Sequence, residues 1–244
     1  MIVQCLLIGG SGQLGKAILQ CNKALKRNAW DIPRRWQLDI ADGANICEWF
    51  RIQPAYDLIV NVAAETRVDF CENNELYSFN VNALGLKYIP RGLGDNKGVL
   101  VHISSDYVFP GTDFSSRKET DPVCPINAYG RTKWAGEVFV RALCPKHFIV
   151  RTAWLYGLHG KNFVKTILKK ARETGRISVV ADQYGSPTFA NDLAGALLQL
   201  AQTEQYGTYH CTNAGVCSWF ELASAAVDIA GIPCEKEAIT TEEY

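Results

Sequence analysis

The sequence predicts an α/β fold in which a doubly wound parallel sheet carries helices on both faces and a smaller lobe follows at the C-terminus. Three observations predict it: short apolar runs alternate with longer amphipathic ones, a glycine-rich turn directly follows the first apolar run, and the pattern changes after Arg151. The composition agrees with a globular protein, because 48% of the 244 residues are hydrophobic and 20% are charged.

The apolar runs predict the strands. They lie at 2–8, 57–61, 99–103 and 148–151. Short continuous apolar runs are typical of strands that are buried on both faces, as parallel strands are. The amphipathic stretches between them predict helices at 12–27, 42–52, 72–89 and 127–142. We expect Pro90 to kink or end the third helix early, because proline lacks the N–H that a helix needs.

After residue 151 the sequence signals for helices and strands are weaker. Loops such as 184–188 separate weaker elements, and helices are expected at 161–174, 190–202 and 218–230. We therefore predict a domain of residues 1–151 and a smaller lobe of residues 152–244 that is interleaved with the last strands of the sheet and closes over a substrate.

Charge and cysteine usage narrow the class of function. Basic and acidic residues number 25 each, so the formal net charge is zero and gives no electrostatic reason to bind nucleic acid or an anionic membrane. The nine cysteines are scattered without a C-x-x-C pair, which favours reduced thiols and a cytoplasmic location. The apolar run at 2–8 is far too short to span a bilayer.

The glycine-rich turn predicts a dinucleotide site. Gly9, Gly12 and Gly15 form the spacing G-x-x-G-x-x-G between the first strand and the first helix. Glycines permit a tight turn and a close approach of backbone N–H groups to a pyrophosphate, and the helix N-terminus favours its negative charge. The position of the turn in a βα unit therefore predicts a Rossmann-type fold that binds NADH or NADPH.

The choice between the two cofactors stays open in the sequence. Asp31 and Asp39 are both at the distance from the glycine turn where an acidic residue contacts the ribose, and Arg34 and Arg35 lie between them. An arginine near the ribose would suit the 2′-phosphate of NADPH. The alternative is that both arginines are simply solvated.

Tyr129 and Lys133 predict a reductase chemistry. Their spacing, Y-x-x-x-K, places both on one face of a helix. A carbonyl that accepts a hydride needs a proton at its oxygen, and a nearby ammonium lowers the pKa of a phenol that delivers one. Ser105 lies just beyond an expected strand, where parallel sheets place their sites, so its hydroxyl can hold the same oxygen.

With these residues the chain resembles the extended short-chain dehydrogenase/reductase family over its whole length. The segments that carry the resemblance are 9–15, 38–42, 61–69, 103–111, 129–137, 151–157 and 182–188. The resemblance implies hydride transfer from NADPH or NADH to the C4 keto group of dTDP-4-dehydro-L-rhamnose, which gives dTDP-L-rhamnose. A small-molecule sugar nucleotide is thus the expected partner, and the family also implies a possible homodimer and, in some members, a magnesium-linked dimer contact.

The resemblance also implies roles by position. The catalytic residues would be Tyr129 as proton donor, Lys133 on the nicotinamide ribose, and Ser105. Besides Tyr129 and Lys133, the cofactor would contact Gly9, Gly12, Gln13, Leu14, Gly15, Asp39, Ile40, Ala63, Ala64 and Glu65. The sugar nucleotide would contact Ser104, Ser105 and Trp154, and no residue is assigned to a metal ion.

Two departures from the family pattern leave alternatives open. Glu65 stands where the family usually carries an aromatic residue or histidine, and the sequence stops at residues 240–244 where the family continues. We therefore expect changed cofactor contacts, and either a truncated sequence or incomplete substrate binding. The alternatives are another sugar-nucleotide reductase, a 4-epimerase, or a non-catalytic regulatory subunit such as the β subunit of methionine adenosyltransferase.

Overall fold

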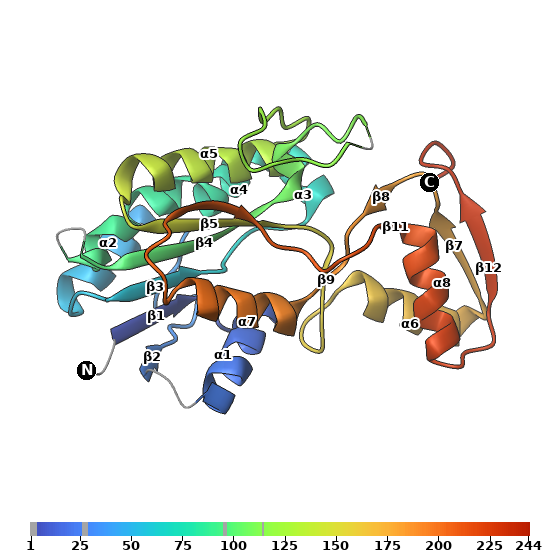
Figure 1. Ribbon diagram of the computed structural model, residues 1–244, viewed down its shortest axis with the longest axis horizontal. Helices are drawn as coiled ribbons and strands as arrows, with labels where there is room; N and C mark the ends of the chain where they lie inside the picture. Colours follow the sequence, from blue (N-terminus) through green and yellow to red (C-terminus); the bar gives the residue numbers. More distant parts are fainter. Residues whose placement is uncertain (1–3, 26–28, 95–96, 114) are drawn as a thin grey trace.

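The computed structural model describes residues 4–25, 29–94, 97–113 and 115–244, and a parallel sheet forms its centre (Figure 1). Within these residues the sheet has six strands in the order β10-β5-β4-β3-β1-β2. They are β1 (Gln4–Ile8), β2 (Ala29–Asp31), β3 (Leu58–Asn61), β4 (Val99–Ser105), β5 (His147–Thr152) and β10 (Gly207–His210). The predicted strands are confirmed, although residues 2, 3, 26 and 27 of the predicted elements lie outside the described residues.

The strand order makes the sheet doubly wound. The chain runs outward from β1 to β2, returns to place β3 on the other side of β1, and continues through β4 and β5 to β10, with every pair parallel. In such sheets ligands bind where the direction of winding reverses, beyond the carboxyl ends of the strands. Here that point lies between Ile8 and Asn61, which are paired at the ends of β1 and β3.

Helices cover both faces of the sheet, as Figure 1 shows. α1 (Gln13–Leu25) and α7 (Ala190–Leu200) pack together on one face, and α2 (Gly43–Ile52), α4 (Glu75–Asn82) and α5 (Ala128–Leu143) cover the other. Two hydrophobic cores result, because alternate strand residues such as Leu7 and Leu6 point to opposite faces. The predicted α/β fold class is confirmed.

The predicted third helix, at 72–89, is wrong in detail. The structure divides this region into α3 (Val68–Asn73), α4 and two 3-10 turns, η1 (Leu84–Lys87) and η2 (Ile89–Leu93). Pro90 is therefore not what ends the α-helix, which has already ended at Asn82. Gly85 lies so close to the Ile40 carbonyl oxygen that an added Cβ would be 2.2 Å from it, so a long-range contact that the helical pattern does not contain lies just after the end of α4.

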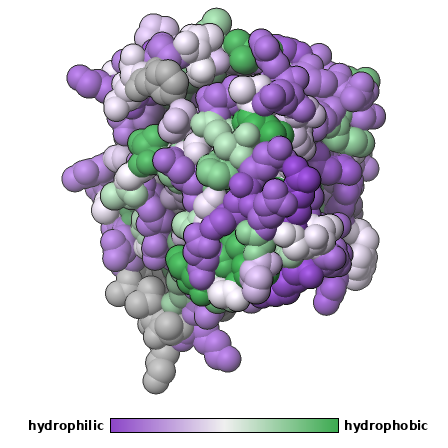
Figure 2. Space-filling view, turned by 90° about the vertical axis from the view of Figure 1, so that its right-hand side faces the viewer, coloured by the Kyte–Doolittle hydropathy of each residue, from purple (hydrophilic) through white to green (hydrophobic). Residues whose placement is uncertain are grey.

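The chain after residue 152 forms a separate layered lobe and also contributes to the sheet. α6 (Phe163–Thr174) and α8 (Trp219–Ile229) pack against the strand pair β7 (Arg176–Val180) and β12 (Glu235–Ile239) around a small core. β10 and α7 belong to the sheet domain instead. The predicted helices of this region are confirmed, whereas the division at residue 151 stays a prediction. On the face formed by this lobe, hydrophobic residues form small patches among hydrophilic ones (Figure 2).

Candidate functional site

Three adjoining cavities lie beyond the carboxyl ends of the strands. The glycine-loop cavity, of about 250 Å³, is lined by residues that include Gly9, Gly12, Arg35, Asp39, Ala63 and Glu65. The central cavity, of about 560 Å³, is lined among others by Gln13, Ser105, Tyr129, Lys133 and Thr152. The tryptophan cavity, of about 400 Å³, includes Asp106, Tyr107, Trp154, Tyr184 and Trp219. The glycine-loop and central cavities share Gly12, Val62 and Ala64, and the central and tryptophan cavities share Asp106, Tyr107, Trp154 and Trp219, so the central cavity adjoins the other two.

The glycine turn fits a dinucleotide because its geometry excludes side chains. Gly9 has a φ of +87°, and a Cβ there would lie 2.6 Å from the backbone nitrogen of Ala63. A Cβ on Gly15 would lie 2.5 Å from the Cα of Gly10, so the first turn of α1 can approach the loop closely. The N-terminus of α1 thus opens directly onto the glycine-loop cavity, where its unpaired N–H groups favour an anion such as a pyrophosphate.

Leu14 and Ile40, two of the predicted cofactor residues, are core residues as well as lining residues. Leu14 is 6% exposed and belongs to the core beneath α1, and Ile40 is 6% exposed and belongs to the opposite core. Both also line the cavities. The structure therefore places these residues at the cavity wall and anchors their side chains in the interior.

Gln13 connects the glycine turn with the C-terminal part of the chain. Its side-chain amide donates to the Leu155 carbonyl oxygen (3.1 Å) and accepts from Asn162 (2.7 Å). Gln13 is one of the expected cofactor residues, and the sequence pattern alone does not indicate these contacts. They fix one wall of the central cavity, because they hold the segment after β5 against the N-terminus of α1.

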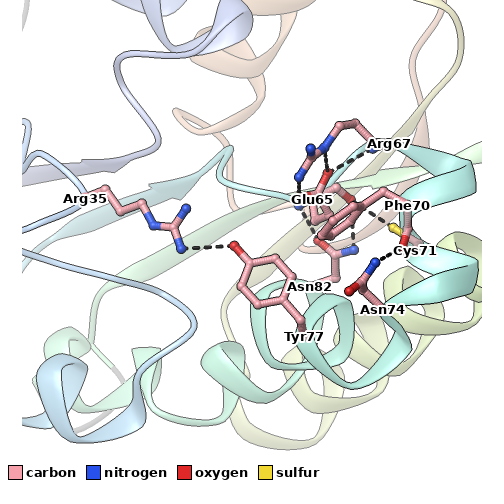
Figure 3. A network of polar contacts seen from close by, with 8 residues as sticks. All are labelled: Arg35, Glu65, Arg67, Phe70, Cys71, Asn74, Tyr77 and Asn82. Atoms are coloured by element: carbon pink, nitrogen blue, oxygen red, sulfur yellow. Dashed lines mark hydrogen bonds and ion pairs between the residues drawn. The ribbon is translucent and has the colours of Figure 1, made fainter.

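Glu65 lies in the polar network of Figure 3. Its carboxylate pairs with Arg67 (2.7 Å), which lowers the pKa of Glu65, and its backbone N–H donates to the Asn82 side chain (2.9 Å). The Asn82 amide donates in return to the Glu65 carbonyl oxygen (3.0 Å) and to Thr132 of α5 (3.1 Å). The negative charge of Glu65, which departs from the family pattern, is therefore balanced by the positive charge of Arg67.

Tyr129 and Lys133 reach the central cavity from the first two turns of α5. The helix begins after Asn127, whose side chain accepts from the Gly130 N–H (2.8 Å) as an N-cap. Lys133 is 2% exposed, and its Nζ donates to the Ile103 carbonyl oxygen at 2.6 Å. Burial lowers the pKa of Lys133 to about 8, while the Glu137 carboxylate acts in the opposite direction.

Ser105 lies beside Tyr129, as the sequence predicts. Burial raises the pKa of the Tyr129 phenol, and the Ser105 hydroxyl beside it acts in the opposite direction. This differs from the expected lowering by Lys133, whose ammonium is directed at Ile103. The phenol is thus protonated at neutral pH. The Tyr107 ring contacts the Tyr129 ring edge to face, with centroids 5.5 Å apart.

Asp106 is a further candidate site residue, which was not among those expected from the sequence. Its carboxylate accepts a hydrogen bond from the Ser105 hydroxyl (2.8 Å), and it lines both the central and the tryptophan cavity. Burial raises its pKa to about 6, although the hydrogen bonds from Ser105 and Tyr107 lower it. Its place directly after Ser105, beyond the end of β4, is the signal that could have identified it.

Ser104 does not share the surroundings of Ser105. Ser104 is 2% exposed, and its hydroxyl donates to Glu137 at 2.6 Å. Glu137, fully buried, also accepts two hydrogen bonds from Arg151 (2.9 and 2.8 Å) and one from Arg141 (2.6 Å). Although the sequence analysis assigned Ser104 to the substrate, the structure places its hydroxyl in a buried ionic network that joins β4, β5 and α5.

Trp154 lies at the boundary between the central and tryptophan cavities. It has a φ of +45°, which is a strained backbone conformation for a residue with a side chain and is typical of functional sites. Its indole stacks on Trp219 at 3.4 Å with an angle of 7°. A Cβ on Gly185 would lie 2.4 Å from the indole. One face of the predicted substrate contact is therefore covered by Trp219, which sequence reasoning missed because α8 is distant in the chain.

The residues that the structure describes provide neither a metal site nor a membrane-spanning helix. Among them, no group of three or more histidine, cysteine, aspartate or glutamate side chains is arranged to hold a metal ion, so the possible magnesium ion is unsupported. In the same part of the chain, each helix is too short or too polar to cross a bilayer.

Comparisons with known proteins place the chain in a family. The family model described as RmlD substrate binding domain matches residues 3–244. The chain is 37% identical to the spore coat polysaccharide biosynthesis protein SpsK of Bacillus subtilis, covering 100% of this chain and 85% of the relative. It is 38% identical to the dTDP-4-dehydrorhamnose reductase of Salmonella typhimurium, covering 98% of this chain and 84% of the relative.

A solved structure agrees with these matches. The dTDP-4-dehydrorhamnose reductase of Bacillus anthracis, in complex with NADP, superposes with a TM-score of 0.93 and is 38% identical, covering 100% of this chain and 86% of that one. Because the family model matches nearly the whole chain, the protein belongs to the RmlD substrate binding domain family.

Proposed function

We propose that this protein reduces the C4 keto group of dTDP-4-dehydro-L-rhamnose to dTDP-L-rhamnose with a nicotinamide cofactor. One observation carries the proposal: Ser105, Tyr129 and Lys133 line the same central cavity, which joins a glycine-loop cavity on one side and a tryptophan cavity on the other. This arrangement provides a place for a dinucleotide, a proton donor and a second ligand in adjoining cavities. The choice of substrate is supported by the similarity to dTDP-4-dehydrorhamnose reductases.

The glycine-loop cavity suits the adenosine and pyrophosphate end of the cofactor. Gly12 and the first turn of α1 would bind the pyrophosphate, Asp39 and Ile40 would lie at the adenosine end, and Ala64 would contact the middle of the dinucleotide. When bound, the reduced nicotinamide supplies a hydride. The buried Thr152 hydroxyl, which has no hydrogen-bond partner in the described part of the chain, lies in the wall of the central cavity and is available to a ligand there.

Tyr129 would donate the proton to the substrate oxygen. Its raised pKa keeps the phenol protonated, as a donor must be. The Ser105 hydroxyl beside it donates its single O–H to Asp106 in this structure, and it would hold the same oxygen by turning that O–H from Asp106 to the substrate. Lys133 uses one of its three N–H donors on Ile103, which leaves two for a ribose hydroxyl at the cavity wall. A charged ammonium there also favours the phenolate that proton transfer produces.

The tryptophan cavity suits the sugar nucleotide. Trp154 and Trp219 provide a rigid aromatic wall, and the Asp106 carboxylate can accept hydrogen bonds from sugar hydroxyls. Ser104 was expected to contact this ligand as well, but its bond to Glu137 supports a positioning role at the end of β4.

A homodimer and a cytoplasmic location remain part of the proposal.

The competing functions are separated by one assay. The purified protein is mixed with NADPH or NADH and dTDP-4-dehydro-L-rhamnose made in the same vessel, and the absorbance of the reduced nicotinamide is followed. We expect the absorbance to fall and dTDP-L-rhamnose to form. Cofactor binding without turnover would instead support a regulatory subunit, and inversion at C4 of a supplied 4-hydroxy sugar nucleotide, without net oxidation of the cofactor, would support an epimerase.

A further inference from the structure

Asn162 joins two parts of the molecule that are distant in the sequence. Its side-chain oxygen accepts from the Lys165 N–H (3.1 Å) and so caps the N-terminus of α6. Its amide nitrogen donates to the Gln13 side-chain oxygen at the start of α1 (2.7 Å) and to the Gly157 carbonyl oxygen (2.8 Å). These partners fix the orientation of the Asn162 amide, because a flipped amide would bring its oxygen against two other acceptors.

The segment of residues 155–162, called the linking segment below, packs closely over Gln13. The Gln13 amide nitrogen donates to the Leu155 carbonyl oxygen (3.1 Å), so the linking segment engages both polar atoms of that side chain. Gly160 has a φ of +70°, and a Cβ there would lie 3.4 Å from the Cβ of Gln13. The linking segment is thus held against the first turn of α1 near both of its ends.

The linking segment also borders the places proposed for the two ligands. Its residues Leu155, Gly160 and Lys161 line the central cavity together with Gly12 and Gln13. Gly12 belongs to the glycine turn and lines the glycine-loop cavity as well. A change in the position of the linking segment would therefore alter the space between the glycine turn and the reacting groups.

Asn162 leads directly into the aromatic wall of the tryptophan cavity. The next residue, Phe163, contacts the Trp219 indole with ring centroids 4.4 Å apart, and Trp219 stacks on Trp154. A continuous series of contacts therefore runs from the glycine turn through Gln13 and Asn162 to this wall.

From these contacts we infer that Asn162 is a positioning residue that couples the cofactor position to the sugar-nucleotide position. The inference rests on the proposed function, because it names how the two ligands of that site are aligned. A dinucleotide at the glycine turn would order the first turn of α1 and hence Gln13, and Asn162 would pass this order to the linking segment and α6. Such alignment matters because a misplacement of about 1 Å between reacting groups can lower a rate about a hundredfold.

Three variants separate the bond to Gln13 from the other contacts of Asn162. Asn162→Ser keeps an oxygen that can cap α6 and removes the amide donor. Gln13→Met keeps the length of the side chain and removes its hydrogen bonds to the linking segment. Lys165→Met is the matched control, because the Lys165 Nζ donates to the Leu158 and Gly160 carbonyl oxygens of the linking segment and not to Gln13.

The first measurement is hydrogen exchange of the full-length protein with and without saturating NADPH, in the absence of any sugar nucleotide. We expect the cofactor to slow exchange about tenfold in peptides covering residues 155–165 of the unsubstituted protein and of Lys165→Met. In Asn162→Ser this protection should be lost, while fluorescence titration gives a cofactor dissociation constant within about threefold of the original. Protection that persists in Asn162→Ser, or that is absent from the unsubstituted protein with cofactor bound, would overturn the inference.

The second measurement is steady-state kinetics at saturating cofactor. We expect Asn162→Ser to lower kcat about ten- to a hundredfold and to leave the KM of the sugar nucleotide within about threefold, because each ligand still binds but the two are poorly aligned. Adding Gln13→Met should lower kcat no further than the more damaging single change, since both remove the same bond. A raised KM with unchanged kcat, or effects that multiply, would contradict the coupling. If the proposed function fails, so that the cofactor binds but the sugar nucleotide is not reduced, the exchange measurement still decides the inference.

Discussion

Gly130 packs directly against the backbone carbonyl of Tyr107, so that an added Cβ would lie 2.1 Å from that oxygen. This contact brings the first turn of α5 against the segment that follows β4. Tyr129 precedes Gly130, and Ser105 precedes Asp106 and Tyr107, so the close approach of the two backbones sets the distance between the phenol and the serine hydroxyl.

Substitution of Gly130 should therefore disturb both stability and the proposed reaction. We expect Gly130→Ala to lower the free energy of unfolding by about 1–3 kcal/mol, as overpacking does, and to reduce kcat. Urea denaturation and steady-state rates measure the two effects. Gly195→Ala in α7 is the matched control, because nothing lies within 4 Å of the added Cβ and the change should stabilise the helix by about 0.5–1 kcal/mol. Equal behaviour of the two variants would contradict the argument.

Tyr129→Phe should remove the proton donor and leave the cofactor site in place. We expect the rate of reduction to fall about 10²–10⁴-fold, the range that a general acid supplies, while the dissociation constant of the cofactor hardly changes. Steady-state kinetics and cofactor fluorescence give the two values separately. Turnover close to that of the unsubstituted protein would exclude Tyr129 as the donor.

Lys133→Met should weaken both cofactor binding and the rate, because one ammonium would serve the ribose and the phenol. Methionine keeps most of the buried stem and removes only the charge and its donors. Because the pKa of Lys133 is about 8, a smaller share of the protein carries the ammonium as pH rises through that value. The rate of the unsubstituted protein should therefore fall above pH 8 relative to that of Lys133→Met. Unchanged cofactor affinity in the variant would rule out the ribose contact.

The raised pKa of Asp106 predicts that the free energy of unfolding depends on pH. The folded pKa is about 6, above the value of 3.8 expected for an unfolded aspartate. Between these values the folded protein binds more protons than the unfolded chain does, so this group makes stability fall as pH rises from about 4 to 6. Across this window the loss is at most about 3 kcal/mol. Melting temperatures of Asp106→Asn and the unsubstituted protein should differ in slope over this range, and parallel curves would contradict the assignment.

Glu137 should be important for stability because it is a buried charge with several partners. Glu137→Gln leaves the buried Arg151 guanidinium without its counter-charge, and we expect a loss of about 3–5 kcal/mol in the free energy of unfolding. Glu48→Gln, which breaks the exposed pair with Arg51, is the control and should leave the free energy of unfolding nearly unchanged. Urea denaturation measures both variants, and a similarly small effect of Glu137→Gln would show that the network is not needed.

Local patterns in the sequence determined the fold class and much of the candidate site. The spacing of Gly9, Gly12 and Gly15 after a buried strand predicted the turn between β1 and α1, because such a turn depends on neighbouring residues. The i, i+4 spacing of Tyr129 and Lys133 likewise required only that the segment be helical. Helices and strands follow from periodicity, which is a property of short stretches of chain.

Tertiary structure decided the contacts between distant segments. The stacking of Trp154 on Trp219, the bond from Arg35 to Tyr77 and the early end of α4 near Gly85 each join residues whose approach depends on how loops and helices pack. A linear pattern does not contain these partners, because burial and hydrogen bonding are set by the whole fold. For the same reason the sequence placed Ser104 beside the substrate, whereas packing directed its hydroxyl to Glu137.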